Sequence, residues 1–382
     1  MTGALLPNII RDFNLSYTAA AILPLAYFIS FGVFAIPAGI LIEKFSYKKV
    51  LLSSYLLGTI GTLIFAYFQN YYSCIIALFI IGCSLSTAQV VVFPLLREAV
   101  GAKKLAYHST FNQLLYGAGA LGSPFLFTLI ISGISERSTA FPFNILHYLS
   151  AGSYTWTTVY WVFFLFFAAS IVIILFIKFP AVHLSEDEKI GDSSSFKELF
   201  SNKYVILFFL ALFSYAACEQ GNGNWLTQFL FKYHSVDPQT TGAKVLSGYW
   251  LLLTIGCGLG MILLKYFDSR KVLLAFAFSS IISLCLAVFG FGKLSILGFL
   301  LLGLSHSVMW PLILALAMNS VKKHHGSLSG ILFAASTGGA FGSVMVGRIG
   351  DLAGLRMGLF FLIVCYLMVT SVYFWSKSSI KN

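Results

Sequence analysis

Eleven long apolar segments, joined by short polar loops, constrain this chain more than any other feature. They lie approximately at residues 17–42, 50–69, 73–97, 106–132, 155–179, 204–232, 243–265, 272–291, 294–320, 327–349 and 357–376. A helix needs about 20 largely apolar residues to cross the hydrocarbon of a bilayer, and each segment meets that length. Hydrophobic residues make up 58% of the sequence and charged residues only 10%, a composition far from that of a soluble domain. The chain is therefore predicted to be an all-α integral membrane protein.

A shorter apolar fragment precedes these segments. Met1–Ile10 is half a helix at most, and the polar residues Arg11 and Asp12 follow it. We interpret the fragment as the outer half of a first helix whose inner half is missing, so the prediction is twelve helices with helix 1 incomplete. An anchor that lies in the membrane interface is the alternative.

The two halves of the chain repeat each other. The segments Gly39–Leu52 and Gly260–Leu274 both close an apolar segment with a small residue, reverse through a short basic loop and open the next segment with Lys-Val-Leu-Leu. We predict two pseudo-symmetric six-helix bundles, at 1–180 and 204–382, joined by a polar cytoplasmic linker at 181–203. Two similar halves are what a transporter needs to rock about a shared midplane site. Convergent loop composition is the alternative.

Basic residues are distributed unevenly among the loops. If helix 1 leaves the cytoplasm, most of the 24 Lys and Arg residues lie in cytoplasmic loops. This bias follows the positive-inside rule and predicts that both termini are cytoplasmic, with the protein in the inner or plasma membrane. Basic loops that face an anionic leaflet account for the net charge of +11 without nucleic acid as a partner. We expect a monomer.

Glu219 is the one carboxylate of the 13 that lies deep inside an apolar segment. An ionisable group at that depth is costly unless it faces protein or water, so it marks a candidate functional site. Removal from water disfavours the charged form of a carboxyl group, and Glu219 is therefore expected to bind a coupling proton. Coordination of Na⁺ beside the carbonyl groups of Gly221–Gly223 is a second possibility. A structural role, in which Glu219 accepts hydrogen bonds from other helices, is the alternative.

Amide and aromatic side chains accompany Glu219 in the apolar segments. Amides donate and accept hydrogen bonds and aromatic rings pack on C–H faces, so this mixture suits a monosaccharide or a similar polyol. The candidate substrate-binding residues are Gln89, Asn112, Gln113, Tyr116, Asn222, Asn224, Trp225, Gln228, Tyr249, Trp250, His306 and Trp310. The alternative is that the amides join helices and the rings mark membrane interfaces. For His306, that alternative is a packed, hydrogen-bonded histidine.

The run Gly221–Asn224 follows Glu219 and consists of weak helix formers. Asparagine side chains also compete for backbone hydrogen-bond partners. We therefore expect an interruption of the helix near the middle of the membrane, where irregular backbone would line a cavity. A close helix contact through the small residues is the alternative.

Several short motifs recur along the chain in a fixed order. They are Phe13–Tyr17, Pro37–Gly39 with Ser46–Lys48, Gln89-Val90 with Pro94, Phe111–Gly119, Glu219 with Gly223–Leu226, Ser247–Trp250 and His306–Pro311. By these motifs and their order, the chain resembles the fucose:proton symporter group of the major facilitator superfamily. The resemblance covers nearly the whole chain. It implies the major facilitator fold and cation-coupled sugar import. The chain departs from the group at Thr2-Gly3, where an Asn-Asp pair is common, at Gln89, where proton-coupled members carry a carboxylate, and at Cys257, where an arginine is common.

Secondary active transport of a small polar solute is the function that these observations favour. The solute is expected to be a monosaccharide that enters by alternating access, driven by H⁺ or Na⁺. No Ser-His-Asp set and no cysteine or histidine cluster occurs in the segments, so neither an enzyme nor a cofactor or metal site is expected. The alternatives are a proton-driven exporter of a lipophilic compound and a nutrient sensor that does not transport.

Overall fold

The computed structural model describes residues 9, 12–14, 17–135, 143–149, 154, 157–177, 179, 198–236, 241–321 and 324–376. Helices make up nearly all of this part of the chain, and none of the described residues forms a β-strand. The prediction of an all-α membrane fold is confirmed. Apart from Ile9, the predicted half helix at residues 1–10 lies outside the described residues, and so does most of the predicted linker.

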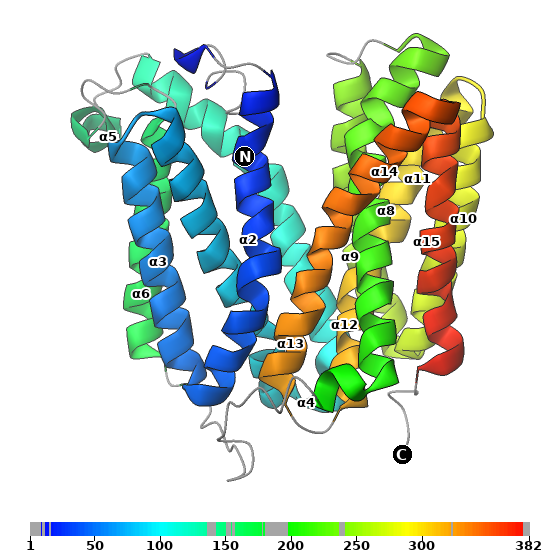
Figure 1. The fold of residues 1–382 in the computed structure, drawn as a ribbon, viewed down its shortest axis with the longest axis horizontal. Coiled ribbons are helices and arrows are strands. Elements are labelled where there is room, and N and C mark those ends of the chain that lie inside the picture. The colour runs from blue at the N-terminus through cyan, green and yellow to red at the C-terminus, as the bar shows by residue number, and fades with distance from the viewer. Residues whose placement is uncertain are drawn as a thin grey trace. The chain divides into compact units, whose positions relative to one another are not determined.

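The helices follow the predicted apolar segments closely (Figure 1). They are α2 (Tyr17–Lys44), α3 (Tyr47–Tyr67), α4 (Tyr71–Ser135), α5 (Phe143–Leu149), α6 (Thr158–Phe176), α8 (Lys203–His234), α9 (Ala243–Tyr266), α10 (Ser269–Phe289), α11 (Lys293–His306), α12 (Met309–Ser320), α13 (His325–Ala334), α14 (Gly338–Ala353) and α15 (Leu355–Trp375). Counted within the described ranges, ten helical stretches are long and apolar enough to cross a membrane. The helix α4 covers two of the predicted segments.

The structure joins two of the predicted segments into one helical run and divides two others. The segments predicted at 73–97 and 106–132 form one helical run that is broken at Gly101, whose φ of 74° suits a residue without a Cβ. The segment predicted at 294–320 is divided between α11 and α12 at Ser307 and Val308. The segment predicted at 327–349 contains a short 3₁₀ turn, η4 (Ala335–Thr337), between α13 and α14.

Pro311 explains the break between α11 and α12. Proline has no backbone N–H, so in a continuous helix the carbonyl group of Ser307 would lose its partner four residues later. The Cys257 thiol donates to the Ser307 carbonyl oxygen instead, with a Sγ–O distance of 3.4 Å. The Ser307 carbonyl group therefore keeps a partner at the break, which lies next to His306.

The chain divides into two compact units. The first contains residues 1–92 and 119–191, and the second contains residues 93–118 and 192–382. In the second unit, a buried core gathers Phe229, Tyr249, Phe299, Leu359 and Tyr366. In the first unit, Phe65 stacks on Tyr160 within a smaller core. The partition into bundles at 1–180 and 204–382 stays a prediction.

The loops that repeat in the sequence also repeat in their contacts, each within its own unit. Ser46 and Asp268 cap the first turns of α3 and α10 with their side-chain oxygens. Lys48 donates to the carbonyl oxygens of Leu175 and Ile177 at the end of α6, at 2.7 and 3.1 Å. The guanidinium group of Arg270 donates to the Tyr373 carbonyl oxygen near the end of α15. A cation at a helix C-terminus offsets the partial negative charge there.

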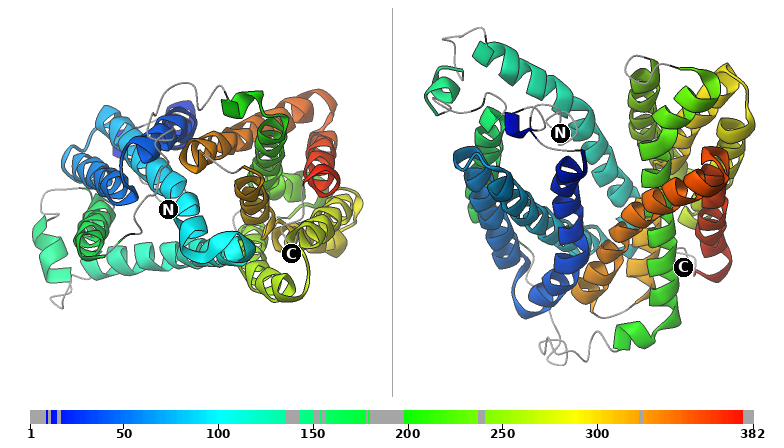
Figure 2. Two further views of the ribbon diagram at one scale, coloured as in Figure 1. Left: turned by 90° about the horizontal axis from the view of Figure 1, so that it is seen from below. Right: turned by 45° about the horizontal axis from the view of Figure 1, so that its top comes forward.

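Helices α8 and α14 cross at close range, as Figures 1 and 2 show. Gly338 and Gly342 of α14 lie against the backbone of Phe213 and Ala217 in α8, where an added Cβ would collide with a carbonyl oxygen. Glycine at these positions lets the two backbones approach closely. This contact fixes the position of α8, the helix that carries Glu219.

Candidate functional site

A buried histidine lies at the centre of a polar cluster in the second unit. The Nδ1 atom of His306 is 2.5 Å from the Tyr249 Oη atom, and its Nε2 atom is 2.6 Å from the Tyr366 Oη atom. All three side chains are fully buried. A neutral imidazole has one donor and one acceptor, so two hydroxyl groups satisfy it completely. His306 is the last residue of α11, and the break that follows lets its carbonyl group join the cluster as well.

Tyr215 connects this cluster to Glu219. The Tyr215 Oη atom is 2.9 Å from the Glu219 Oε1 atom and 3.0 Å from the His306 carbonyl oxygen. A phenol has one proton to donate, and a carbonyl oxygen can only accept. When Glu219 is ionised, both oxygens compete for the same proton. When Glu219 is protonated, it donates to Tyr215 while Tyr215 donates to the carbonyl oxygen, so every group is satisfied.

The predicted interruption of the helix that carries Glu219 is wrong, and the hydrogen bonds of Asn222 explain why. The helix α8 is continuous from Lys203 to His234 and passes through Gly221–Asn224 without a break. The Nδ2 atom of Asn222 donates to the Cys218 carbonyl oxygen at 2.7 Å and to the Tyr366 Oη atom at 2.9 Å. The asparagine therefore bonds within the helix instead of opening it. The helical run is interrupted instead at Ser307 and Val308, between α11 and α12.

Three of the other candidate residues, Trp310, Trp250 and Tyr116, lie around this cluster in the second unit. The Trp310 ring is 6.0 Å from the Tyr215 ring, and the Trp250 ring packs edge-on against Tyr249. Tyr116 is 62% exposed and lies within electrostatic reach of Glu219. Glu219 itself is partly exposed. A buried polar cluster therefore ends at one carboxyl group that solvent or a solute can reach.

The remaining candidate residues lie elsewhere. Asn112 and Gln113 are partly exposed on α4, in the portion that belongs to the second unit. Gln89 is partly exposed in the first unit. Asn224, Trp225 and Gln228 lie further along α8, against α14: the Asn224 amide donates to the Ser343 Oγ atom at 2.6 Å, and the Trp225 indole donates to the Ser343 carbonyl oxygen at 2.9 Å.

Several polar residues that the structure brings to these sites were not predicted from the sequence. Tyr215 and Tyr366 were missed because a tyrosine in an apolar segment resembles any other packed ring. Ser343, Arg348 and Asp351 of α14 were also missed, although Arg348 lies inside the segment predicted at 327–349. A cation in an apolar segment was the signal that could have identified this helix.

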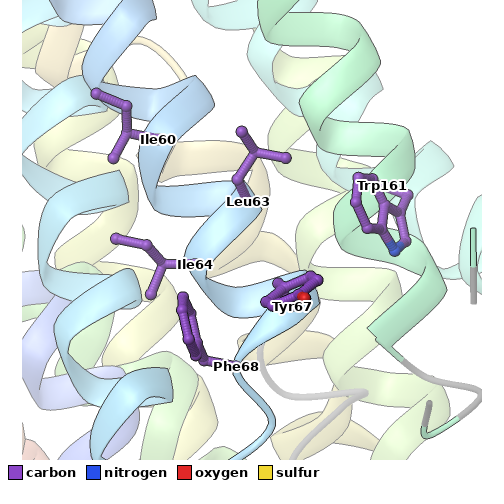
Figure 3. A pocket seen from close by; sticks show the side chains of 6 residues that line it. All are labelled: Ile60, Leu63, Ile64, Tyr67, Phe68 and Trp161. Carbon is purple, nitrogen blue, oxygen red and sulfur yellow. The ribbon is translucent and has the colours of Figure 1, made fainter. Parts of the chain in front are cut away.

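A hollow in the first unit is unsuited to a polar solute (Figure 3). It has a volume of about 320 Å³ and is lined by Ile60, Leu63, Ile64, Tyr67, Phe68 and Trp161. The lining is hydrocarbon apart from the heteroatoms of Tyr67 and Trp161.

Comparison with known proteins places this architecture in a family. The model of the Major Facilitator Superfamily matches residues 1–342. The chain belongs to this superfamily. Its relatives include a glucose/galactose transporter of Brucella abortus, which is 25% identical over 97% of this chain and 88% of the relative. They also include the L-fucose-proton symporter of Escherichia coli, which is 26% identical over 93% of this chain and 84% of the relative.

The superfamily fold is also found in solved structures. A crystal structure of the transporter FucP in the outward conformation matches with a TM-score of 0.85 and 21% sequence identity, over 99% of this chain and 94% of FucP. The predicted major facilitator fold is thereby confirmed. The superfamily and the relatives are transporters, so the prediction of a transporter rather than an enzyme is confirmed as well.

Proposed function

We propose that the protein imports a monosaccharide by alternating access and that Glu219 binds the coupling proton. The relatives named as glucose/galactose transporter and L-fucose-proton symporter support a sugar as the solute. The amides and rings of the second unit support it too, since they supply the donors, acceptors and apolar faces that a sugar requires.

The hydrogen bond between Tyr215 and Glu219 is the observation on which the coupling role rests. Protonation of Glu219 changes the hydrogen bonds of Tyr215 and, through it, the partner of the His306 carbonyl group. The two protonation states therefore differ in whether Tyr215 of α8 is free to donate its hydrogen bond to the His306 carbonyl oxygen at the end of α11. A proton that is bound or released at Glu219 can bias the conformation of this unit because it has a different interaction energy in each state.

The continuous α8 favours H⁺ over Na⁺. A sodium ion beside Glu219 would need carbonyl ligands from Gly221–Gly223, but those carbonyl groups lie inside the continuous helix. In a regular helix they accept hydrogen bonds from the following turn and are not free to bind an ion. We therefore assign the coupling to a proton.

The orientation in the membrane follows from the basic loops. We propose that both termini are cytoplasmic and that the protein works as a monomer in the inner or plasma membrane. The sugar and the proton then enter together from the outside. The side chains of His306, Tyr249 and Asn222 bind protein partners, and Tyr215 holds Glu219. The partly exposed Gln113 and the exposed Tyr116 contact the sugar.

Uptake into proteoliposomes tests this function. The purified protein is reconstituted, an inward proton gradient is imposed, and accumulation of labelled D-glucose, D-galactose and L-fucose is measured. We expect accumulation of at least one sugar that collapses when a protonophore is added. A sensor would bind the sugar without accumulation. An exporter of lipophilic compounds would leave the sugars outside and would exchange a lipophilic cation for protons, so that the cation moves opposite to the proton flow. Sugar binding without accumulation, or such an exchange without sugar uptake, would overturn the proposal.

A further inference from the structure

A groove between α8 and α14 contains polar residues that the Glu219 cluster does not use. It has a volume of about 760 Å³, within the range of about 300–1,000 Å³ typical of small-molecule sites. Its polar and aromatic lining consists of Asn224, Trp225 and Gln228 from α8 and Ser343, Arg348 and Asp351 from α14. Both helices belong to the second unit.

The wall of this groove is fixed by contacts between the two helices. Ser343 accepts from the Asn224 amide with its hydroxyl group and from the Trp225 indole with its carbonyl group. Gly347 faces the Trp225 ring, where an added Cβ would lie 2.6 Å from a ring carbon. The missing side chain at Gly347 therefore makes room for the indole. Asn224 and Trp225 are held in place before any ligand arrives.

Other polar groups of the groove are exposed. Gln228, Arg348 and Asp351 are exposed, and within the described part of the chain no side chain forms an ion pair with Arg348 or Asp351. Both charged side chains lie in the last turns of the candidate span His325–Ala353, so this face of α8 and α14 is expected to meet water or a polar solute. Arg348 and Asp351 lie three residues apart on one helix and carry opposite charges. The groove is therefore neutral overall and rich in donors and acceptors.

We propose that this groove is a second binding site for an uncharged monosaccharide, separate from the contacts near Glu219. Arg348 donates to sugar hydroxyl groups, Asp351 accepts from them, and Gln228 does both, while the Trp225 ring forms part of the wall. The opposite charges favour a neutral sugar over a sugar acid, because a carboxylate would meet Asp351 beside Arg348. This inference rests on the proposed sugar transport. It adds a site that the sugar occupies before it reaches Glu219.

Kinetics of the Arg348→Gln variant test the site. In proteoliposomes, the KM for the transported sugar should rise about tenfold, the change that follows loss of a hydrogen bond to a charged group, while the maximal rate stays the same. The control is Arg356→Gln, which removes an equal charge from α15, where the guanidinium group lies 4.8 Å from the Tyr233 ring centroid. An unchanged KM in Arg348→Gln would overturn the second site while transport itself continued.

Protection of a cysteine gives an independent measurement. The six native cysteines are buried or half-buried, so Gln228→Cys adds an exposed thiol in the groove. At a neutral-sugar concentration about ten times its Kd, a membrane-impermeant thiol reagent should label this cysteine about tenfold more slowly, because few sites remain empty. A sugar acid should give no protection. The control is Lys232→Cys, one helical turn further along α8 and outside the lining, whose labelling should not change. Labelling of Gln228→Cys that the transported sugar leaves unchanged would contradict the proposal.

These outcomes separate the groove from the proposed function. If no neutral sugar is transported and none protects Gln228→Cys, the proposed function fails and the groove site fails with it. If the sugar is transported but neither the KM nor the labelling responds, only the groove site fails. Protection that persists in the Glu219→Gln, Gln228→Cys double variant would support binding in the groove independently of the carboxyl group.

Discussion

The two compact units share side-chain caps and cation–carbonyl contacts at their helix ends, but they differ in the polar groups of their interiors. Ser46 and Asp268 cap equivalent helices, and Lys48 and Arg270 bind the last carbonyl groups of α6 and α15. Gly82 and Gly303 each lie against the carbonyl oxygen of a tyrosine, Tyr27 in the first unit and Tyr249 in the second. The repeated sequence therefore preserves the contacts that set how helices meet.

The interiors of the two units are not equivalent. In the first unit, Ser54 and Ser84 exchange hydrogen bonds between α3 and α4, at 2.7 and 2.8 Å. In the second unit, the hydroxyl groups of Ser279 and Ser305 form one hydrogen bond between α10 and α11, and the cluster of His306 and Glu219 lies beside them. The repeat thus provides a scaffold in both units, and on this scaffold the second unit carries a hydrogen-bonded cluster of a histidine and a carboxyl group.

The largest expected effect on stability comes from the histidine of the second unit. His306→Ala removes the partner of two buried hydroxyl groups and leaves a cavity, so the free energy of unfolding should fall by about 3 kcal/mol. Ser84→Ala in the first unit removes one interhelical hydrogen bond and should cost about 0.6–1 kcal/mol. Denaturant unfolding of both variants in detergent measures the difference. Equal losses of unfolding free energy in the two variants would mean that the polar contacts of the two interiors stabilise the protein equally.

Tyr215 is the next test of the difference between the units. Tyr215→Phe keeps the ring but removes the hydroxyl group that Glu219 and the His306 carbonyl group share, so gradient-driven accumulation should fall about tenfold. The matched control is Tyr55→Phe in α3, whose ring packs against Phe167. Uptake assays of both variants at equal protein density decide the outcome. If the two variants transport equally well, the hydroxyl group of Tyr215 has no special role.

The smallest expected effect concerns the feature that the units share. Lys48→Gln should reduce the free energy of unfolding by about 0.5–1 kcal/mol, because the end of α6 loses a cation. Arg270→Gln should cost slightly more, since its guanidinium group also lies 5.0 Å from the Tyr373 ring centroid. Thermal unfolding of the two variants checks this. A large loss in only one of them would show that the repeated loops have diverged in function.

Hydropathy predicted nearly all of the helices because a membrane span is defined by length and apolar content. The break beside His306 was not predicted, although Pro311 was visible, because the consequence of proline lies four residues earlier, at the Ser307 carbonyl group. The interruption expected at Gly221–Asn224 was wrong, since Asn222 bonds back to its own helix. Propensity alone cannot tell which partner an asparagine will choose.

The candidate site was predictable only where charge or amide chemistry was unusual for an apolar segment. Glu219 was identified for this reason, and Tyr215 and His306 now provide its hydrogen-bonded surroundings. Tyr366 was not identified, because its role depends on contacts with α8 and α11 that no local pattern encodes. Arg348 is the second-last residue of the segment predicted at 327–349 and Asp351 follows that segment, so the pair resembled the start of a loop although Arg348 lies within the segment.

The most direct test of the central claim is the transport activity of Glu219→Gln. The neutral amide mimics the protonated carboxyl group, so gradient-driven accumulation should be abolished while counterflow exchange of labelled sugar continues. Glu198→Gln, an exposed carboxylate of the same unit, serves as the control and should accumulate sugar normally. Accumulation by Glu219→Gln at the wild-type rate, under a proton or a sodium gradient, would contradict the assignment of Glu219 as the coupling residue.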